Sequence, residues 1–166
     1  MNTRNIVVMG VAGCGKSSVG KMLAEALGAS FIEGDSFHPQ ENIERMRAGI
    51  PLDDASRAGW LAALAEQLSA ARTSGHATVL ACSALKRRYR DALRGGDPEL
   101  RFVHLQGEAE LIAARMRERS GHFMPESLLA SQFADLEPPE MDERAIAVDI
   151  GAPPPAMLRC ILSTLD

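Results

Sequence analysis

The junction between the first apolar run and the glycine-rich segment after it restricts the fold more than any other feature. Ile6–Met9 is rich in β-branched residues, and Gly10–Ser17 reads Gly-Val-Ala-Gly-Cys-Gly-Lys-Ser, which matches G-x-x-x-x-G-K-[ST] in full. A helical apolar stripe from Val19 to Leu27 follows, with Gly28 as a natural helix end. Strand, loop and helix in this order predict a phosphate-binding loop within an α/β fold.

The residue types of this loop explain its chemistry. Glycines let the backbone curl so that several N–H groups point inward, and the following helix adds its positive N-terminal end. Lys16 is expected to reach the β- and γ-phosphates as a catalytic cation, and Ser17 to ligate Mg²⁺ through its hydroxyl. The predicted nucleotide-binding residues of the loop are Gly10, Ala12, Gly13, Cys14, Gly15, Lys16, Ser17 and Ser18.

Apolar runs alternate with helical patterns along the rest of the chain. The expected strands are Ile6–Met9, Ser30–Glu33, Thr78–Cys82, Arg101–Gln106 and Ala145–Ile150. Helical stripes fall between them, one after Pro125, and the run Pro153–Pro155 is expected to be a spacer before a final helix. This alternation predicts a five-stranded parallel sheet in a three-layer α/β/α fold, with ligands bound at the carboxyl ends of the strands.

Composition narrows the class of protein. The 166 residues suit one domain, 1–166, and a net charge of -4 argues against non-specific nucleic-acid binding. The three cysteines form no C-x-x-C pair, so neither a disulfide framework nor a structural zinc site is expected. No apolar run reaches the roughly 20 residues of a membrane span, and the N-terminus does not resemble a signal peptide. We therefore expect a cytoplasmic protein without a membrane partner.

The other motifs favour a small-molecule kinase among nucleotide-binding proteins. A GTPase usually carries Asn-Lys-x-Asp, which none of the asparagines begins. Large ATPases usually have a carboxylate at the end of a hydrophobic strand, whereas the third strand ends in Ala81-Cys82-Ser83. The nearest acids after a strand are Glu33 and Asp35, an arrangement similar to that of the shikimate kinase type.

A longer series of motifs makes the resemblance specific. The chain resembles the bacterial gluconokinase family from about Ile6 to about Pro138, in the family's order, through the phosphate loop and the following segments: Gly34-Asp35-Ser36-Phe37-His38-Pro39, Asn42, Met46, Gly49–Asp54, Arg57, Trp60-Leu61, Cys82–Lys86, Tyr89-Arg90-Asp91, Arg115, Arg119, His122–Pro125 and Leu128–Phe133. Ser56 stands where the family usually has an acid, and Gly59 where it usually has proline. Ser56 is a candidate helix cap.

The resemblance implies the strand order 2-3-1-4-5, a small lid around residues 115–125 and a homodimer. It also implies ATP and Mg²⁺ as cofactors and conversion of D-gluconate to 6-phospho-D-gluconate. Arg115 and Arg119 are then lid residues that bind ATP, Arg119 being catalytic, and Gly121 is a hinge. His122 is expected to contact the substrate or the closed lid.

The remaining roles follow from what phosphoryl transfer to a sugar acid requires. Asp35 is predicted to orient the acceptor hydroxyl as a catalytic residue, and Glu33 to assist the metal through water. Guanidinium and ammonium groups suit a carboxylate ligand, so Arg57, Lys86 and Arg90 are substrate-binding candidates. The other predicted substrate-binding residues are Asp35 for the hydroxyl, His38 as a further candidate in its loop, and His122, which the resemblance implies. Trp60 is interpreted as packing, Met9, Met22 and Met46 as core, and Arg87 and Arg88 as surface.

Two alternatives stay open from sequence. One is a related kinase that acts on shikimate or another sugar acid. The other is a nucleotide-binding regulator without catalysis, for which Ser56 and Gly59 are the only support. A redox role for Cys14 inside the loop is a further hypothesis.

Overall fold

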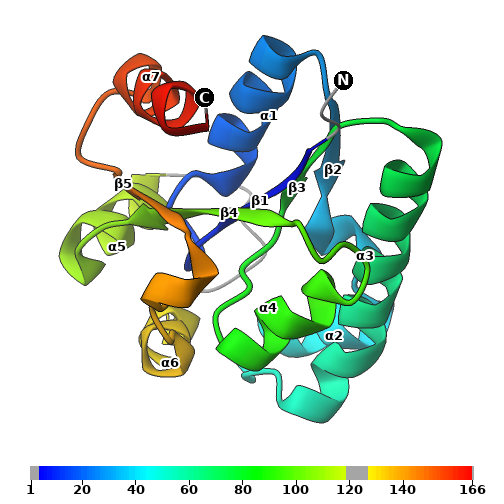
Figure 1. Ribbon diagram of the computed structural model, residues 1–166. Helices are drawn as coiled ribbons and strands as arrows, with labels where there is room; N and C mark the ends of the chain where they lie inside the picture. Colours follow the sequence, from blue (N-terminus) through cyan, green and yellow to red (C-terminus); the bar gives the residue numbers. More distant parts are fainter. Residues whose placement is uncertain (1–3, 119–126, 166) are drawn as a thin grey trace.

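One parallel sheet organises the molecule. The computed structural model describes residues 4–118 and 127–165. Its strands are β1 (Asn5–Met9), β2 (Ser30–Glu33), β3 (Thr78–Ala81), β4 (Arg101–Gln106) and β5 (Ile146–Asp149). They pair in the order β2-β3-β1-β4-β5 (Figure 1), which confirms the predicted topology. Every residue of the central strand β1 is buried, as a strand covered on both faces requires.

The described helices and 3₁₀ turns connect these strands. Their bounds are α1 (Lys16–Leu27), η1 (Gly34–Phe37), α2 (Gln40–Arg47), α3 (Asp54–Ser74), α4 (Arg87–Arg94), α5 (Ala109–Glu118), α6 (Ser127–Asp135), η2 (Met141–Glu143) and α7 (Pro154–Leu165). Arg119, Gly121, His122 and Pro125 lie outside the described residues, as does most of the predicted lid. The described residues include no helix that is long and apolar enough to span a membrane.

Alternating strand residues build two cores. Ile6 and Val8 face one side of the sheet and pack with α1, α5 and α7, whereas Val7 and Met9 face α3 and α4 on the other side. Figure 1 shows α1 and α7 together on one face and α3 with α4 on the opposite face. Because side chains in a strand alternate between faces, the same short strands supply apolar residues to both faces of the sheet.

Several element boundaries differ from the predictions. β3 ends at Ala81 rather than Cys82, and β5 is shorter than expected at both ends. Pro154 and Pro155 belong to the first turn of α7, where proline lacks only an N–H that has no helical partner, so the predicted spacer is wrong at these positions. The cap of α3 is Asp53, which accepts a hydrogen bond from the Ser56 N–H, so Ser56 is not the cap.

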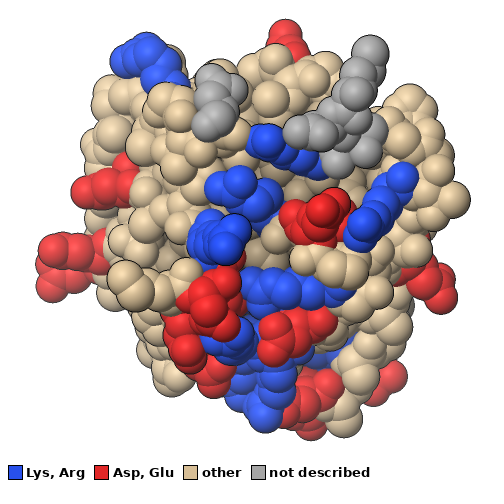
Figure 2. All heavy atoms as spheres, in the orientation of Figure 1, with Lys and Arg blue, Asp and Glu red and all other residues tan. Residues whose placement is uncertain are grey.

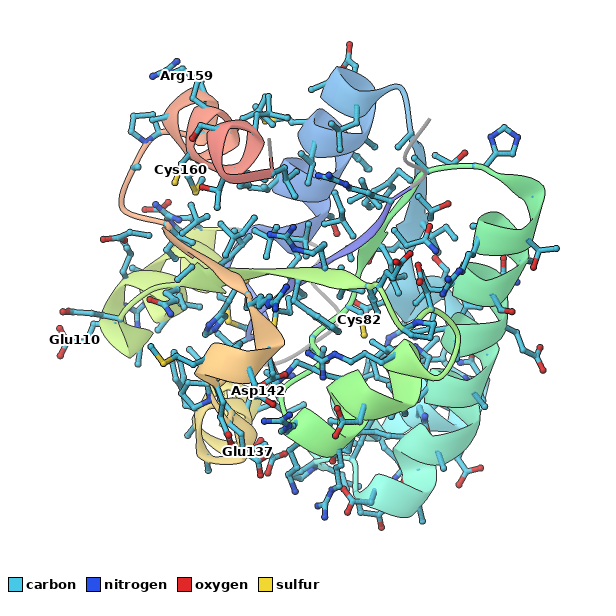
Figure 3. All side chains as sticks on the ribbon, viewed as in Figure 1. Cys82, Glu110, Glu137, Asp142, Arg159 and Cys160 are labelled. Atoms are coloured by element: carbon cyan, nitrogen blue, oxygen red, sulfur yellow. The ribbon has the colours of Figure 1, made fainter. Side chains whose placement is uncertain are left out.

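The three cysteines are not paired with one another. Cys82 lies in the interior at the end of β3, whereas Cys160 is exposed on α7 far from it (Figure 3). Cys14 is buried in the core beneath the glycine-rich loop. The expectation that the chain uses no disulfide agrees with this arrangement.

Candidate active site

The glycine-rich loop curls between β1 and α1 as predicted. Gly13 has a φ of 80°, a left-handed conformation that disfavours a side chain, and a Cβ there would lie 2.6 Å from the Met116 side chain. Gly15 caps α1 in a similar conformation. The loop lines one side of a pocket through Ala12, Gly13, Gly15, Lys16, Ser17 and Ser18. The N-terminus of α1 and the Lys16 ammonium therefore give this side of the pocket a positive character that suits phosphate.

Gly10 and Cys14 do not line this pocket. The Gly10 N–H donates to the Ser83 carbonyl at 3.2 Å, so this residue joins the loop to the end of β3. The Cys14 side chain is 1% exposed and packs in the core. Their contact with nucleotide stays a prediction for the backbone, because neither residue lines the pocket in this structure.

Ser17 of the loop and Glu33 at the end of β2 meet in the pocket. The Ser17 hydroxyl donates a hydrogen bond to the Glu33 carboxylate, and both residues line the pocket. Among the described residues, no group of three His, Cys, Asp or Glu residues could enclose a metal by itself. A hydroxyl and a carboxylate beside a phosphate loop are nevertheless the hard oxygen ligands that Mg²⁺ takes. Few protein ligands are enough, because this ion keeps several waters and binds substrate phosphates.

Asp35 enters the pocket from η1, directly after β2. The backbone at Gly34 passes so close to β3 that a Cβ would lie 2.4 Å from the Ala81 carbonyl oxygen. The Gly34 carbonyl accepts a hydrogen bond of 2.8 Å from the Trp60 indole N–H. These two contacts fix the backbone that carries Asp35, whose side chain is 48% exposed and lines the pocket.

His38 faces Asp35 across the same pocket. Its ring stacks on Trp60 with centroids 4.0 Å apart and planes at 17°, and its Nε2 lies 3.9 Å from Asp35 Oδ1. Burial, with the nearby Arg57 charge as a smaller cause, lowers the pKa of His38 to about 4. The imidazole is therefore neutral at physiological pH.

Arg57 contributes a second cation to the pocket, in addition to Lys16 of the phosphate loop and from a different helix. It lies on α3, is 8% exposed and lines the pocket. Its Nη1 donates to the Tyr89 hydroxyl at 2.8 Å and lies 3.5 Å from Asp135 Oδ2. Tyr89 in turn donates to Asp54, and this hydrogen bond is the main reason why the pKa of Asp54 is lowered. The guanidinium is thus held by side chains from two other helices, α4 and α6.

Lys86 and Arg90 do not line the pocket. Lys86 Nζ lies 3.9 Å from Asp54 Oδ1, behind Tyr89. Arg90 is fully buried, and its guanidinium donates to both Glu143 carboxylate oxygens and to the Ala84 and Leu85 carbonyls. The structure therefore does not bring Arg90 to the pocket as predicted, because its buried guanidinium is paired inside the protein.

The neighbouring Arg87 and Arg88 are on the surface as predicted. Figure 2 shows acidic and basic side chains interleaved over the face formed by α4 and its neighbours. Arg87 pairs with Asp142, and its backbone N–H donates to Glu137 at 2.9 Å. Figure 3 shows these two acids close together beside α4. The basic run of α4 therefore fastens this helix to the segment after α6.

Arg115 lies apart from the pocket in the last turn of α5. Its Nη2 donates to the Ile150 carbonyl at 2.9 Å, which joins α5 to the end of β5. The structure does not place this arginine among the pocket residues. Arg119 and His122, predicted as catalytic and substrate-binding, lie outside the described residues.

Sequence reasoning missed several residues of the site. Gln132 and Ser83 line the pocket, and the Ala12 N–H donates to Gln132 Oε1 at 2.7 Å. Trp60, interpreted as packing only, supports both His38 and Gly34. Gln132 lies within an apolar helical stripe, and a polar residue at such a position could have indicated a buried polar contact. Trp60 gave no such signal, because its contacts come from segments far apart in sequence.

The comparisons with known proteins agree with this geometry. A protein-family model described as an AAA domain matches residues 6–139. A gluconokinase from Gluconobacter oxydans (strain 621H) is 50% identical over 148 residues, which cover 89% of this chain and 83% of that protein. A crystal structure of a gluconokinase from Sinorhizobium meliloti 1021 is 51% identical with a TM-score of 0.89, covering 98% of this chain and 91% of that chain. An unliganded sugar kinase from Janibacter sp. HTCC2649 is 49% identical with a TM-score of 0.96, covering 99% of this chain and 95% of that chain. The chain therefore belongs to the gluconokinase family.

Proposed function

We propose that this protein transfers the γ-phosphoryl group of ATP to the 6-hydroxyl of D-gluconate. One observation carries the proposal from the geometry: the phosphate loop and the acceptor-side residues Asp35, His38 and Arg57 line the same pocket. The membership of the gluconokinase family supports gluconate as the acceptor. Donor and acceptor groups that share one pocket are what an in-line transfer between two bound substrates needs.

The loop side is assigned to the nucleotide. Backbone N–H groups of the loop and the N-terminus of α1 bind phosphate oxygens, and Lys16 neutralises charge on the transferred group. Ser17, with Glu33 through water, would hold Mg²⁺. When bound, this ion neutralises charge on the β- and γ-phosphates. The all-oxygen character of the Ser17–Glu33 pair supports this assignment.

The opposite side is assigned to the acceptor. Asp35 accepts a hydrogen bond from the 6-hydroxyl and orients its oxygen toward the γ-phosphorus. It takes the proton as the new P–O bond forms, while the bond from the γ-phosphorus to the β–γ bridging oxygen breaks and ADP leaves with that oxygen. Arg57 offers a buried guanidinium to the sugar acid, and its bonds to Tyr89 and Asp135 keep it in position. Lys86, held near Asp54, adds positive charge behind Tyr89.

Other parts of the proposal rest on the family resemblance. They are one kinase domain over residues 1–166, a lid around residues 115–125 with Arg115, Arg119 and His122, a homodimer and a cytoplasmic location. The choice of ATP over GTP also rests on the resemblance.

No specific observation favours either alternative, a kinase for another acceptor or a non-catalytic regulator. Ser56 and Gly59 do not line the pocket, and a Cβ on Gly59 would meet no atom within 4 Å. The Ser56 hydroxyl bonds with Asp53 and Arg45 on the outer side of α3. The departures from the family pattern therefore leave the reacting groups unchanged, and the reading as a non-catalytic regulator loses its only support.

An acceptor panel tests the proposal. Purified protein with Mg-ATP is assayed for ADP release with gluconate, shikimate, other sugar acids or no acceptor. Release that depends on gluconate is the expected result. Release with another acceptor alone, or none with any acceptor despite ATP binding, overturns the assignment.

A variant of Asp35 tests the mechanism. Asp35→Asn is expected to lower kcat by about 100-fold or more while nucleotide binding is retained, because the amide cannot take the proton. Asp91→Asn, an exposed change on α4, is the matched control and is expected to keep full activity. Full activity of Asp35→Asn would remove Asp35 from the mechanism.

A further inference from the structure

We propose that Asn42, which does not line the active pocket, is a positioning residue that holds His38 in its neutral Nε2–H tautomer, so that His38 and Asp35 together frame one hydroxyl group of the acceptor. The inference deepens the proposed function and rests on it for the identity of the acceptor. The tautomer itself is a property of the protein alone.

The contacts of Asn42 determine which of its atoms faces His38. Asn42 is 3% exposed, and its Nδ2 lies 2.9 Å from the Ser56 carbonyl oxygen and 3.2 Å from His38 Nδ1. A carbonyl oxygen can only accept, so the Asn42 atom facing Ser56 must be the NH₂ group. The same NH₂ group then donates its other proton to His38 Nδ1. The proton of the neutral imidazole is therefore on Nε2.

The direction of this Nε2–H is fixed by the ring's surroundings. Stacking on Trp60 holds the plane of the imidazole, and Trp60 is itself anchored to the Gly34 carbonyl, one residue before Asp35. The distance of 3.9 Å between His38 Nε2 and Asp35 Oδ1 is too long for a direct hydrogen bond. An oxygen atom at about 2.8 Å from each would bridge them.

The donor and acceptor character of the two groups selects what bridges them. The bridging atom must accept from Nε2–H and donate to the Asp35 carboxylate, and a hydroxyl does both. A carboxylate of the substrate can only accept, so it would repel Asp35 at this place. The neighbouring Arg57 suits the carboxylate better. The pocket thus recognises a sugar acid by binding a hydroxyl between His38 and Asp35 and the carboxylate at Arg57.

Burial and the Arg57 charge favour the neutral form of His38, and the Asp35 carboxylate is the charged group that opposes them. Asp35 faces His38 from η1 and Arg57 from α3, while Lys16 and Glu33 line the same pocket from the phosphate-loop side. Protonation would place an N–H on Nδ1 against the Asn42 NH₂ group, two donors with no acceptor between them. The lowered pKa of His38 agrees with this conflict.

The tautomer is measured directly by long-range ¹⁵N–¹H correlation NMR on the full chain labelled with ¹⁵N-histidine. The four histidines are assigned with single substitutions. In the wild-type protein at pH 7 without substrate, His38 is expected to show a pyridine-like Nδ1 and a pyrrole-like Nε2. A pyrrole-like Nδ1, or an imidazolium, overturns the proposal without any variant being needed.

Asn42→Asp tests the consequence for the reaction. Its carboxylate accepts instead of donating, so His38 Nδ1 gains a proton. We expect the NMR signature to change, kcat/KM for gluconate to fall at least tenfold with a new ionisation in its pH profile, and KM for ATP to stay within twofold. Ser56→Ala is the matched control, since it leaves the Ser56 carbonyl in place and should change neither the tautomer nor kcat/KM.

The two proposals fail in distinguishable ways. Absence of gluconate-dependent ADP release by the wild-type protein contradicts the proposed function, whereas the NMR signature of His38 is read without substrate. If Asn42→Asp changes the tautomer but leaves kcat/KM for gluconate unchanged, Asn42 is not a positioning residue for the reaction. If Asn42→Asp does not fold, Asn42→Ser, which keeps a small hydroxyl donor, is expected to retain part of the wild-type tautomer and activity. Wild-type kinetics in Asn42→Ser together with a mixed tautomer would overturn the proposal.

Discussion

Gln132 Oε1 accepts a hydrogen bond of 2.7 Å from the Ala12 backbone N–H, so α6 is tied directly to the phosphate loop. Asp135, three residues later on the same helix, lies 3.5 Å from Arg57 on the acceptor side. Residues three apart lie on one face of a helix. One face of α6 therefore contacts both the loop assigned to the donor and the arginine assigned to the acceptor.

Gln132→Ala is expected to lower kcat/KM for ATP by about tenfold, because a partly buried backbone N–H loses its acceptor, at a cost of about 1–3 kcal/mol. Steady-state kinetics with varied ATP give the value. Ser131→Ala on the same helix is the control, since within the described residues the Ser131 hydroxyl donates to the Leu128 carbonyl of its own turn. Equal kinetics for the two variants would show that the Gln132 contact does not support the loop.

Arg90→Met is expected to destabilise the protein without changing gluconate binding. The variant leaves Glu143 buried without its main partner, and such a loss costs about 3–5 kcal/mol, or a fall in Tm of roughly 10 °C for a domain of this size. Thermal unfolding and the KM for gluconate at 25 °C are measured together. Arg88→Met, an exposed change, is the control for Tm. A clear rise in KM for Arg90→Met would restore Arg90 as a substrate residue.

His104 is expected to make the fold less stable in mild acid. It is 4% exposed in β4, and burial, with the Arg90 charge as a second cause, lowers its pKa to about 4. Between pH 6.5 and 4 the unfolded chain binds a proton at this histidine that the folded chain does not, so stability falls as the pH falls through this window. A shift of this size corresponds to about 3 kcal/mol.

Urea unfolding at pH 7, 5.5 and 4.5 measures that dependence. His104→Gln should flatten the change in unfolding free energy over this range, while His76→Gln, at an exposed position, should leave it as in the wild type. An identical pH dependence for His104→Gln and the wild type would contradict the lowered pKa. His38 titrates in a similar range and contributes separately in all three proteins.

Thiol chemistry tests the redox hypothesis for Cys14. A thiol reagent is expected to modify one cysteine of the native protein, the exposed Cys160, and all three in denaturant. Burial raises the pKa of Cys82 to about 12, and Cys14 is 1% exposed, so neither presents an accessible thiolate. Rapid labelling of a second thiol, slowed by ATP, would instead support a reactive Cys14.

Local patterns were enough to predict the sheet and the loop. The Gly10–Ser17 pattern needs only the residues within it, and β2 and β4 have the predicted bounds because their apolar runs end at clear breaks. Asp35 could be placed at the pocket because the carboxyl ends of parallel strands meet at one edge of the sheet. The strand order, by contrast, came from the family resemblance and not from periodicity.

Roles that depend on long-range partners could not be read from the chain. Arg57 and Arg90 are both arginines on helices, yet Arg57 faces the pocket whereas Arg90 meets Glu143, 53 residues away. The Asn42–His38 pair and the Gln132–Ala12 contact likewise depend on how separate helices pack. The sequence alone determined the phosphate loop and the α/β class, because those follow from local backbone preference and hydrophobic period. Only the tertiary structure decided which polar side chains reach the pocket, because a hydrogen-bond partner far along the chain is set by packing.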